Sequence, residues 1–275
     1  MCLGLMEEEW DVAIILDACR YDTFKEVYRK YLPEGRLEKR VGAKDTYDWL
    51  MKNFGDGFYD VIYVSGHPAI NSYGVPWYKF KAIDHFFKIY NAWDIGWDEK
   101  IGTTKPEVVK ETAVKALKEN PKKKVIVHFM QPHAPYRMQP LQDRSVINRD
   151  FWKGKGKVRK IRLKLIRSIA SSICQNFGVA NLFFSIRKKL NLPLNGIEEW
   201  YWRNFSREEL IAMYADNLGW ALESVKELVD EVLESTDKRV IVTADHGEAL
   251  GENGFWFHLN NSPWVRIIPY LIVGE

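Results

Sequence analysis

The sequence predicts an α/β domain in which a central, mostly parallel β-sheet carries helices on both faces. Two observations support this fold class. Short continuous apolar runs rich in Val and Ile, typical of buried parallel strands, recur at 11–16, 60–65, 124–130, 239–244 and 266–273. Helical patterns lie between these runs, and such alternation produces layered α/β folds. The 275 residues, 46% of them hydrophobic, suffice for one such domain with insertions, so we expect 1–275 to form a single domain.

Helices are expected where apolar residues recur with helical spacing, namely at 22–32, 46–54, 105–120 and 206–236. The third of these has Pro106 at its first turn, where the missing N–H of proline is tolerated, and it ends before Pro121. The fourth is long and amphipathic and opens with Ser206-x-x-Glu209. That spacing is the signature of a capping box, in which each side chain bonds to the backbone N–H of the other residue.

Composition and chain ends argue against several classes of protein. No apolar run approaches the ~20 residues that a membrane-spanning helix needs. The N-terminal sequence MCLGLMEEEW lacks the basic and apolar regions of a secretory signal. Three cysteines, Cys2, Cys19 and Cys174, are scattered and odd in number, which argues against a disulfide framework. We therefore expect a cytoplasmic protein, with peripheral contact at the inner membrane surface as an addition.

The stretch 137–205 breaks the alternation of strands and helices, and we expect a basic helical insertion there. Residues 151–191 hold eleven Lys and Arg and no Asp or Glu, which leaves 29 basic and 37 acidic residues elsewhere. Two interpretations stay open: a lid whose cations face water, or a surface that contacts an anionic membrane. Apolar residues are interleaved with the cations, which favours a membrane surface over nucleic acid, so no nucleic-acid partner is expected.

Acidic and histidine residues collect directly after the predicted strands, and five of the six histidines lie in these segments. Ligands of open α/β sheets bind beyond the carboxyl ends of the strands, so we expect these side chains to converge at one edge of the sheet. In chain order they are Asp17, Arg20 and Asp22, then Ser65 and His67, then His128 and His133, then Asp245, His246, Glu248 and His258.

Carboxylates together with imidazoles suit a metal site. This combination favours zinc or manganese, whereas calcium and magnesium, the alternatives, prefer oxygen ligands alone. The candidate ligands are enough for one divalent ion and nearly enough for two: Asp17, His133, Asp245, His246 and His258. Two divalent ions would clamp the attacking and leaving oxygens of a phosphoryl transfer.

Thr46 is the candidate nucleophile. It lies where a loop becomes the helix 46–54, and a helix N-terminus favours an anionic group. A metal-bound hydroxyl at that position would lose its proton and attack phosphorus. The alternative, which local sequence alone favours, is that Thr46 or Asp45 is only the N-cap of the helix. Ser65 and Thr23 are the fallback nucleophiles.

Three motifs resemble those of the alkaline phosphatase/sulfatase superfamily. ILDACRYD at 15–22 looks like its first metal-binding strand, and HFMQPHAPY at 128–136 is similar to its His-x-x-x-x-His-x-Pro segment. ADHGEALGENGFWFH at 244–258 is similar to a segment of its phosphoethanolamine transferase branch, although the membrane half of that branch is missing. The resemblance covers 10–136 and 206–273. It implies a three-layer alkaline-phosphatase-like sandwich with the basic insertion added.

The resemblance also implies roles for the individual residues. The main metal would be bound by Asp17, Thr46, Asp245 and His246, with Thr46 also the residue that becomes phosphorylated. A second metal, or the anionic group of the substrate, would be bound by His133 and His258, and either could protonate the leaving oxygen. His128 would line the substrate pocket. Arg20 would contact the substrate oxygens or support a ligand, or pair with Asp22, and Glu248 would orient a ligand or cap its loop.

The implied activity is that of a metal-dependent hydrolase or transferase that acts on phosphate mono- or diesters through a covalent phospho-threonine. The expected partner is an anionic ester, either lipid-linked or a glycan. The sulfatase signature Cys-x-Pro-x-Arg is absent, so a sulfatase without formylglycine is the alternative enzyme on the same fold. A non-catalytic module that docks on membranes through 151–191 is the alternative from another class.

Overall fold

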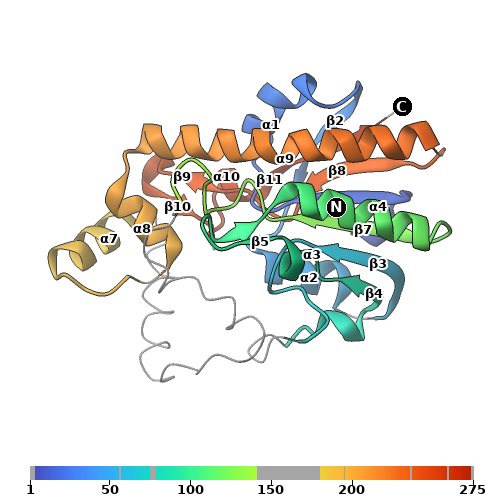
Figure 1. Ribbon diagram of the computed structural model, residues 1–275. Helices are drawn as coiled ribbons and strands as arrows, with labels where there is room; N and C mark the ends of the chain where they lie inside the picture. Colours follow the sequence, from blue (N-terminus) through green and yellow to red (C-terminus); the bar gives the residue numbers. More distant parts are fainter. Residues whose placement is uncertain are drawn as a thin grey trace.

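The structure is a computed structural model that describes residues 4–55, 57–74, 79–140, 180–194, 196–235, 237–258 and 260–273. Its centre is a seven-stranded sheet in the order β2-β11-β8-β1-β7-β3-β4 (Figure 1). These strands are β1 (Val12–Leu16), β2 (Gly35–Val41), β3 (Tyr59–Ser65), β4 (Phe86–Tyr90), β7 (Lys124–Phe129), β8 (Val240–Ala244) and β11 (Ile267–Val273). The strands from β8 to β4 are parallel to one another, and β11 pairs antiparallel with both of its neighbours, β8 and β2. The predicted, mostly parallel sheet is confirmed.

Two short hairpins and several helices complete the described part. The hairpins pair β5 (Trp97–Asp98) with β6 (Thr103–Thr104) and β9 (Ala249–Leu250) with β10 (Trp256–Phe257). The helices are α1 (Tyr21–Val27), α2 (Thr46–Phe54), α3 (Ala92–Gly96), α4 (Pro106–Glu119), α7 (Ala180–Lys189), α8 (Ile197–Asn204), α9 (Arg207–Ser235) and α10 (Pro263–Arg266). Single 3-10 turns are η1 (Leu5–Glu7), η2 (Tyr28–Lys30), η3 (Ala82–Asp84) and η5 (Glu252–Gly254).

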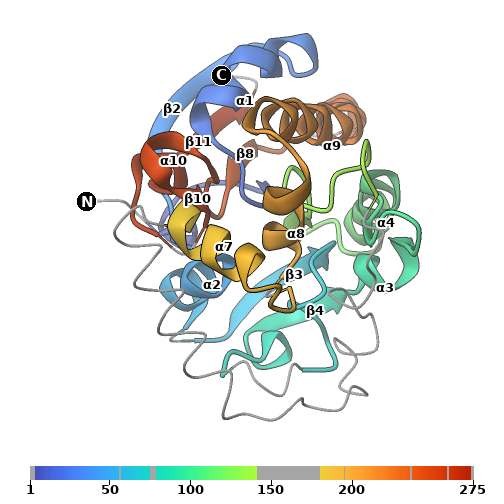
Figure 2. The same ribbon diagram turned by 90° about the vertical axis from the view of Figure 1, so that its left-hand side faces the viewer.

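Helices cover the sheet on both faces, which explains the unbroken apolar runs. All of β1 is buried, and its side chains alternate between the two layers. Val12, Ile14 and Leu16 pack in the core beneath α1, α4 and α9, whereas Ala13 and Ile15 pack on the side of α2 and η1. In Figure 2 the sheet passes between α9 and α4 on one side and α2 on the other.

Helix ends follow the predicted signals closely. Pro106 is the first residue of α4. The capping box before α9 is present, because the Ser206 N–H donates to Glu209 Oε2 (2.7 Å) and the Glu209 N–H donates to Ser206 Oγ (3.2 Å). The helix predicted at 22–32 is shorter than expected. It ends at Val27 and continues as the 3-10 turn η2.

Two strands that the apolar runs do not predict, β2 and β4, form the two edges of the sheet. Their sequences, GRLEKRV and FFKIY, include exposed or charged residues, and β2 has no fully buried residue. An edge strand has an unpaired side and a partly solvated surface, so it does not need the continuous apolar run of a central strand. This is why the sequence pattern detects the centre of the sheet and not its borders.

Part of the predicted insertion at 137–205 is described as a hairpin of α7 and α8. It lies at one end of the molecule, beside β9 and β10 (Figure 1). An aromatic cluster that includes Phe184, Tyr201 and Phe257 joins the hairpin to β10. Most of the basic stretch lies outside the described residues, which resume at Ala180. Among the described residues, no helix combines the length and the apolar character needed to cross a membrane.

Candidate metal centre and active site

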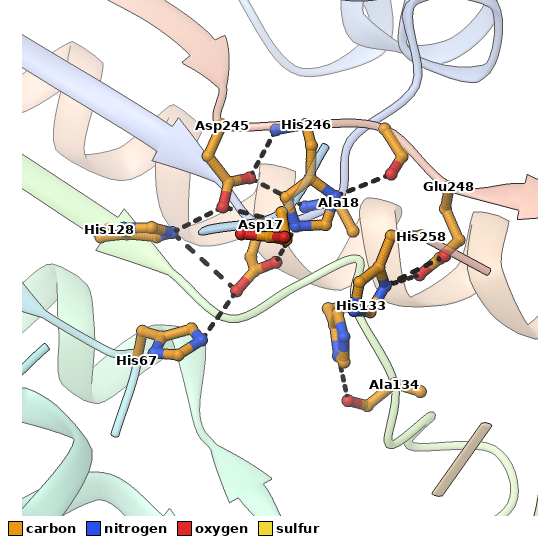
Figure 3. A network of polar contacts seen from close by, with 12 residues as sticks. Asp17, Ala18, His67, His128, His133, Ala134, Asp245, His246, Glu248 and His258 are labelled. Atoms are coloured by element: carbon orange, nitrogen blue, oxygen red, sulfur yellow. Dashed lines mark hydrogen bonds and ion pairs between the residues drawn. The ribbon is translucent and has the colours of Figure 1, made fainter. Parts of the chain in front are cut away.

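Loops after four neighbouring parallel strands bring the predicted side chains together at the carboxyl edge of the sheet (Figure 3). They come from the ends of β1, β3, β7 and β8, as the topology of an open α/β sheet requires. The sixth histidine of the chain, His85, lies instead against Phe80, with ring centroids 4.2 Å apart, and bonds to the carbonyl of Gly57. The predicted convergence of five histidines at one edge is therefore seen in the structure.

Two carboxylates form the centre of the site, and we call the group around them the Asp17–Asp245 cluster. His246 Nε2 lies 3.5 Å from Asp17 Oδ1 and 3.6 Å from Asp245 Oδ2. His128 Nε2 lies 3.9 Å from Oδ2 of each aspartate. His67 Nε2 lies 3.4 Å from Asp17 Oδ2, and its side chain is partly exposed. The other four side chains are buried.

Several polar atoms in this cluster lack a partner. Asp245 Oδ1 accepts hydrogen bonds from the backbone N–H groups of Ala18 (3.1 Å) and His246 (2.8 Å). Asp245 Oδ2, both carboxylate oxygens of Asp17 and His128 Nε2 are buried without a hydrogen bond from the described part of the chain. Burial, together with the charges of Asp245 and Glu248, raises the pKa of Asp17 well above its ordinary value. A divalent cation would compensate these oxygens, so the residues fit a metal.

His246 has the protonation state of a metal ligand. Its Nδ1 lies 2.8 Å from the carbonyl oxygen of Gly247, which can only accept, so Nδ1 carries the proton. Burial lowers the pKa of His246 to about 3, so the ring is neutral near pH 7. The Nε2 lone pair therefore points at the two carboxylates, in the arrangement typical of a metal-binding histidine whose other nitrogen is held by a carbonyl.

His128 is in the opposite tautomer, and its contact with Tyr63 determines which ring nitrogen carries the hydrogen. Burial lowers the pKa of His128 to about 4, so this ring is neutral too. Tyr63 Oη lies 2.7 Å from His128 Nδ1, and within the described residues this is the only hydrogen bond of the buried hydroxyl. A buried hydroxyl donates its hydrogen, so Nδ1 accepts and the ring proton lies on Nε2. In this tautomer His128 presents an N–H donor, which suits a substrate oxygen. The same nitrogen also lies within 4.8 Å of ligand atoms of Asp17 and Asp245, a spacing that could hold a metal ion if Nε2 lost its proton.

A second group, the Glu248 cluster, consists of His133, Glu248 and His258, whose ligand atoms lie within 4.8 Å of one another. His258 Nδ1 is 3.2 Å from Glu248 Oε1, and the His258 ring lies 4.9 Å from that of His246, centroid to centroid. Burial opposes protonation of His258, but the charge and hydrogen bond of Glu248 outweigh it and raise the pKa to about 9. His258 can therefore serve as a cation or proton donor near neutral pH, or exchange its proton for a metal.

Thr46 is the first residue of α2, and the preceding residue, rather than Thr46 itself, caps the helix. Asp45 is the N-cap, with its carboxylate accepting from the Asp48 N–H at 2.7 Å. The Ala43 N–H donates to the carbonyl of Asp245 (2.9 Å), which holds the start of α2 against the Asp17–Asp245 cluster. Asp45 is also close enough to His258 to contribute to its raised pKa. The N-terminus of α2 therefore lies beside both clusters, with the Thr46 hydroxyl not used as a cap.

The remaining predicted residues have structural partners. The Arg20 guanidinium donates to Asp22 (2.8 Å) and to Glu252 (2.7 Å), so it joins the loop after β1 to the glycine-rich loop after β8. Ser65 Oγ donates to the carbonyl of His67 (2.8 Å) and shapes that loop. Thr23 lies on α1, where its hydroxyl contacts Asp22. Ser65 and Thr23 therefore have local hydrogen-bond partners, and Arg20 joins two of the loops at the site.

Two residues of the site were not assigned a role from sequence. His67 follows β3 just as the ligands follow the other strands, so its position was a usable signal. The role of Tyr63 carried no such signal. It depends on β3 lying next to β7, with Ser65 in register with His128, and only the folded sheet shows this pairing.

Comparisons with known proteins give a family and a fold. A model of the sulfatase family matches residues 38–267. No curated protein sequence matches the chain significantly. The C-terminal periplasmic domain of EcEptC from Escherichia coli, in complex with zinc, is similar in structure with a TM-score of 0.54 at 13% identity. That similarity covers 99% of this chain and 75% of the other.

Two further structures show the same fold at similar identity. The soluble domain of lipooligosaccharide phosphoethanolamine transferase A from Neisseria meningitidis has a TM-score of 0.51 at 12% identity, covering 95% of this chain and 75% of that one. BT1596, a 2-O GAG sulfatase, has a TM-score of 0.50 at 12% identity, covering 98% and 65%. The chain spans 47% of the full integral membrane form of the Neisseria protein. The predicted alkaline-phosphatase-like α/β fold is confirmed.

Proposed function

Because the chain belongs to the sulfatase family, we propose that it is a metal-dependent hydrolase or transferase of phosphate esters in which Thr46 is the nucleophile. One observation carries this proposal. Both carboxylate oxygens of Asp17 and Oδ2 of Asp245 are buried without a partner among the described residues. The Ala43 N–H donates to the Asp245 carbonyl and ties the approach to α2 to this cluster, and Asp45 rather than Thr46 caps the helix. A cation site next to a hydroxyl at a helix N-terminus is an arrangement suited to attack on an anionic ester.

Asp17, Asp245 and His246 would hold the main divalent ion, together with the Thr46 hydroxyl. The mixed carboxylate and imidazole set supports zinc or manganese. The similar EcEptC domain is described in complex with zinc, which agrees with this choice. When bound, the ion would supply positive charge that favours an ionised threonine hydroxyl and neutralises the phosphoryl oxygens.

The residues of this chain would then divide the reaction between them. Ionised Thr46 Oγ1, whose proton has passed to solvent, attacks phosphorus, the bond from phosphorus to the ester oxygen breaks, and phospho-threonine forms. His128 donates its Nε2–H to a phosphoryl oxygen. His258, protonated near pH 7 because of Glu248, gives its proton to the leaving oxygen. Water or an acceptor alcohol next attacks phosphorus and returns its proton to His258, and Thr46 is released.

The substrate class follows from the charges and from the similar proteins. Protonated His258 and the N–H of His128 favour an anionic ester, and two of the similar proteins are named for lipooligosaccharide and for a GAG. We propose a phosphate ester carried on a lipid or a glycan. A sulfate ester is the second candidate, because the family model is that of the sulfatases. The nucleophile position favours phosphate, because no Cys-x-Pro-x-Arg motif supplies a formylglycine.

The test is a side-by-side assay of aryl phosphate monoesters, phosphate diesters and sulfate esters with the zinc- or manganese-loaded protein. We expect turnover of a phosphate ester, loss of that turnover in Thr46→Ala, and phosphate on Thr46 by mass spectrometry after a rapid acid quench. Thr23→Ala is the matched control, since it removes a threonine hydroxyl from α1, and it should keep wild-type turnover. Wild-type turnover by Thr46→Ala would contradict the assignment, and preference for sulfate would favour the second candidate. Absence of turnover on every ester would favour a non-catalytic module.

A further inference from the structure

The α7–α8 hairpin presents an exposed apolar row. Leu182, Ile186 and Leu190 are 60%, 47% and 64% exposed. They lie four residues apart, so they share one face of a helix. Leu190 follows the last residue of α7, but its N–H still donates to the carbonyl of Ile186 (2.9 Å), which keeps it in line. Three adjacent aliphatic side chains on one face form a contiguous apolar patch, unlike single exposed apolar residues, which are common on protein surfaces.

The hairpin holds this row in a defined orientation. The opposite face of α7 is buried in the aromatic cluster through Ala180, Phe184 and Arg187. The Arg187 guanidinium bonds to the buried carboxylate of Glu199 on α8 at 3.0 Å, and Trp202 Nε1 donates to Asn181 Oδ1 at 2.9 Å. The apolar row therefore stands on an anchored helix, and its exposure does not come from an unpacked segment.

The charges beside the row are positive. Arg187, Lys188 and Lys189 occupy the last turn of α7, its first turn has no acidic residue, and both lysines are exposed. Glu199, the acid facing α7, is buried and bound by Arg187 and Arg203. Exposed aliphatic side chains with neighbouring lysines match an anionic lipid surface, in which the chains enter the acyl boundary and the ammonium groups stay at the headgroups.

The hairpin also adjoins the proposed active site. The Tyr136 N–H donates to Tyr201 Oη (2.9 Å), which ties α8 to the segment that follows His133. The rings of Phe184 and Phe257 lie 6.2 Å apart, centroid to centroid, and Phe257 directly precedes His258. In Figure 2, α7 and α8 face the viewer in front of β10 and the ends of the central strands. A surface held by α7 would therefore lie close to the Glu248 cluster.

We propose that this face, the α7 stripe formed by Leu182, Ile186, Leu190 and Lys189, docks the protein on an anionic lipid surface. A second copy of the chain is the competing occupant. Pairing two stripes would bring the lysines of both copies together, and such like-charge contacts oppose association. An anionic bilayer complements the same lysines. The docking does not depend on which ester the site cleaves, so it can be tested without turnover.

The test measures co-sedimentation with vesicles of phosphatidylcholine alone and of phosphatidylcholine mixed with phosphatidylglycerol. We expect wild type to bind the mixed vesicles. The triple change Leu182→Ser, Ile186→Ser and Leu190→Ser should lower partitioning about a hundredfold, since it removes three roughly half-exposed aliphatic side chains. Lys189→Gln should lower it about fivefold on the mixed vesicles and leave binding to phosphatidylcholine unchanged.

The matched control removes as many exposed apolar side chains elsewhere. Ile83→Ser, Phe87→Ser and Ile95→Ser change residues that are 50%, 50% and 75% exposed, outside the hairpin. This variant should bind as wild type does, and thermal unfolding should show that both triple variants fold. The proposal is overturned if the α7 variant partitions like wild type or if wild type binds neither vesicle. It is equally overturned if the stripe forms a dimer that the α7 variant abolishes while vesicles stay unbound.

Discussion

Replacement of Asp245 by Asn should shift the stability of the metal-free and the metal-loaded protein in opposite directions. Asp17 and Asp245 offer oxygens within 4.8 Å of each other. Two full charges at that separation, in a medium of effective dielectric constant near 20, repel each other by about 3 kcal/mol. At a pH where both carboxylates are ionised, the substitution would remove this repulsion, and the new amide could keep its oxygen on the N–H groups of Ala18 and His246. For a chain of this length, about 3 kcal/mol corresponds to a rise of about 5 °C in Tm.

This gain should depend on pH in a defined direction. The folded-state pKa of Asp17 lies above its ordinary value of 3.8, so the folded metal-free protein holds a proton that the unfolded chain releases. The stabilisation that Asp17 contributes is complete below its ordinary pKa and is lost as the pH rises through its raised folded-state pKa. The advantage of Asp245→Asn over wild type should therefore be small in acid and grow toward alkaline pH.

Zinc should reverse the order of the two proteins. At a thousandfold excess over its Kd, a ligand of the native state stabilises by about 4.1 kcal/mol, about 7 °C here, which exceeds the gain of about 3 kcal/mol from the substitution. Wild type should show this rise, whereas Asp245→Asn, which lacks the Oδ2 carboxylate oxygen, should show little. Scanning calorimetry with a chelator and with zinc measures both effects, and Asp84→Asn, an exposed aspartate in η3, is the matched control. If Asp245→Asn were the less stable protein with chelator and gained as much from zinc as wild type, the reasoning would be refuted.

Further expectations concern Tyr63, Glu248 and Ser206. Tyr63→Phe leaves His128 Nδ1 unpaired, so it should cost about 1–3 kcal/mol of stability and reduce ester turnover. The zinc-induced rise in Tm should persist in this variant. Loss of that rise would show that His128 binds the metal. Glu248→Gln removes the charge that raises the pKa of His258 to about 9. The alkaline limb of the pH–rate profile should therefore move toward about 6.5, the ordinary pKa of histidine. If the alkaline limb does not move, His258 is not the acid. Ser206→Ala breaks the capping box of α9, so it should lower the free energy of unfolding by about 1 kcal/mol without changing kcat. A fall in kcat with unchanged stability would contradict a purely structural role for Ser206.

The sequence was sufficient to predict the central strands because strands buried on both faces have a recognisable apolar sequence. β1, β7 and β8 are buried on both faces, so their apolar runs are continuous and recognisable. Parallel strands share one carboxyl edge, so residues that follow them had to converge, whatever the details of packing. The edge strands β2 and β4 were not predicted because a half-solvated strand does not need a continuous apolar run.

The roles of individual atoms were decided by the tertiary structure alone. Whether Asp45 or Thr46 caps α2 depends on one backbone geometry, and both residue types suit the position by sequence. Whether an imidazole offers a lone pair or a proton depends on the partner of its other nitrogen. For His246 that partner is the carbonyl of the next residue, and for His128 it is Tyr63, 65 residues away in the chain. The sequence thus determined which side chains meet at the site. The fold decided which atom each one presents, because hydrogen-bond partners on neighbouring strands are brought together only when the sheet forms.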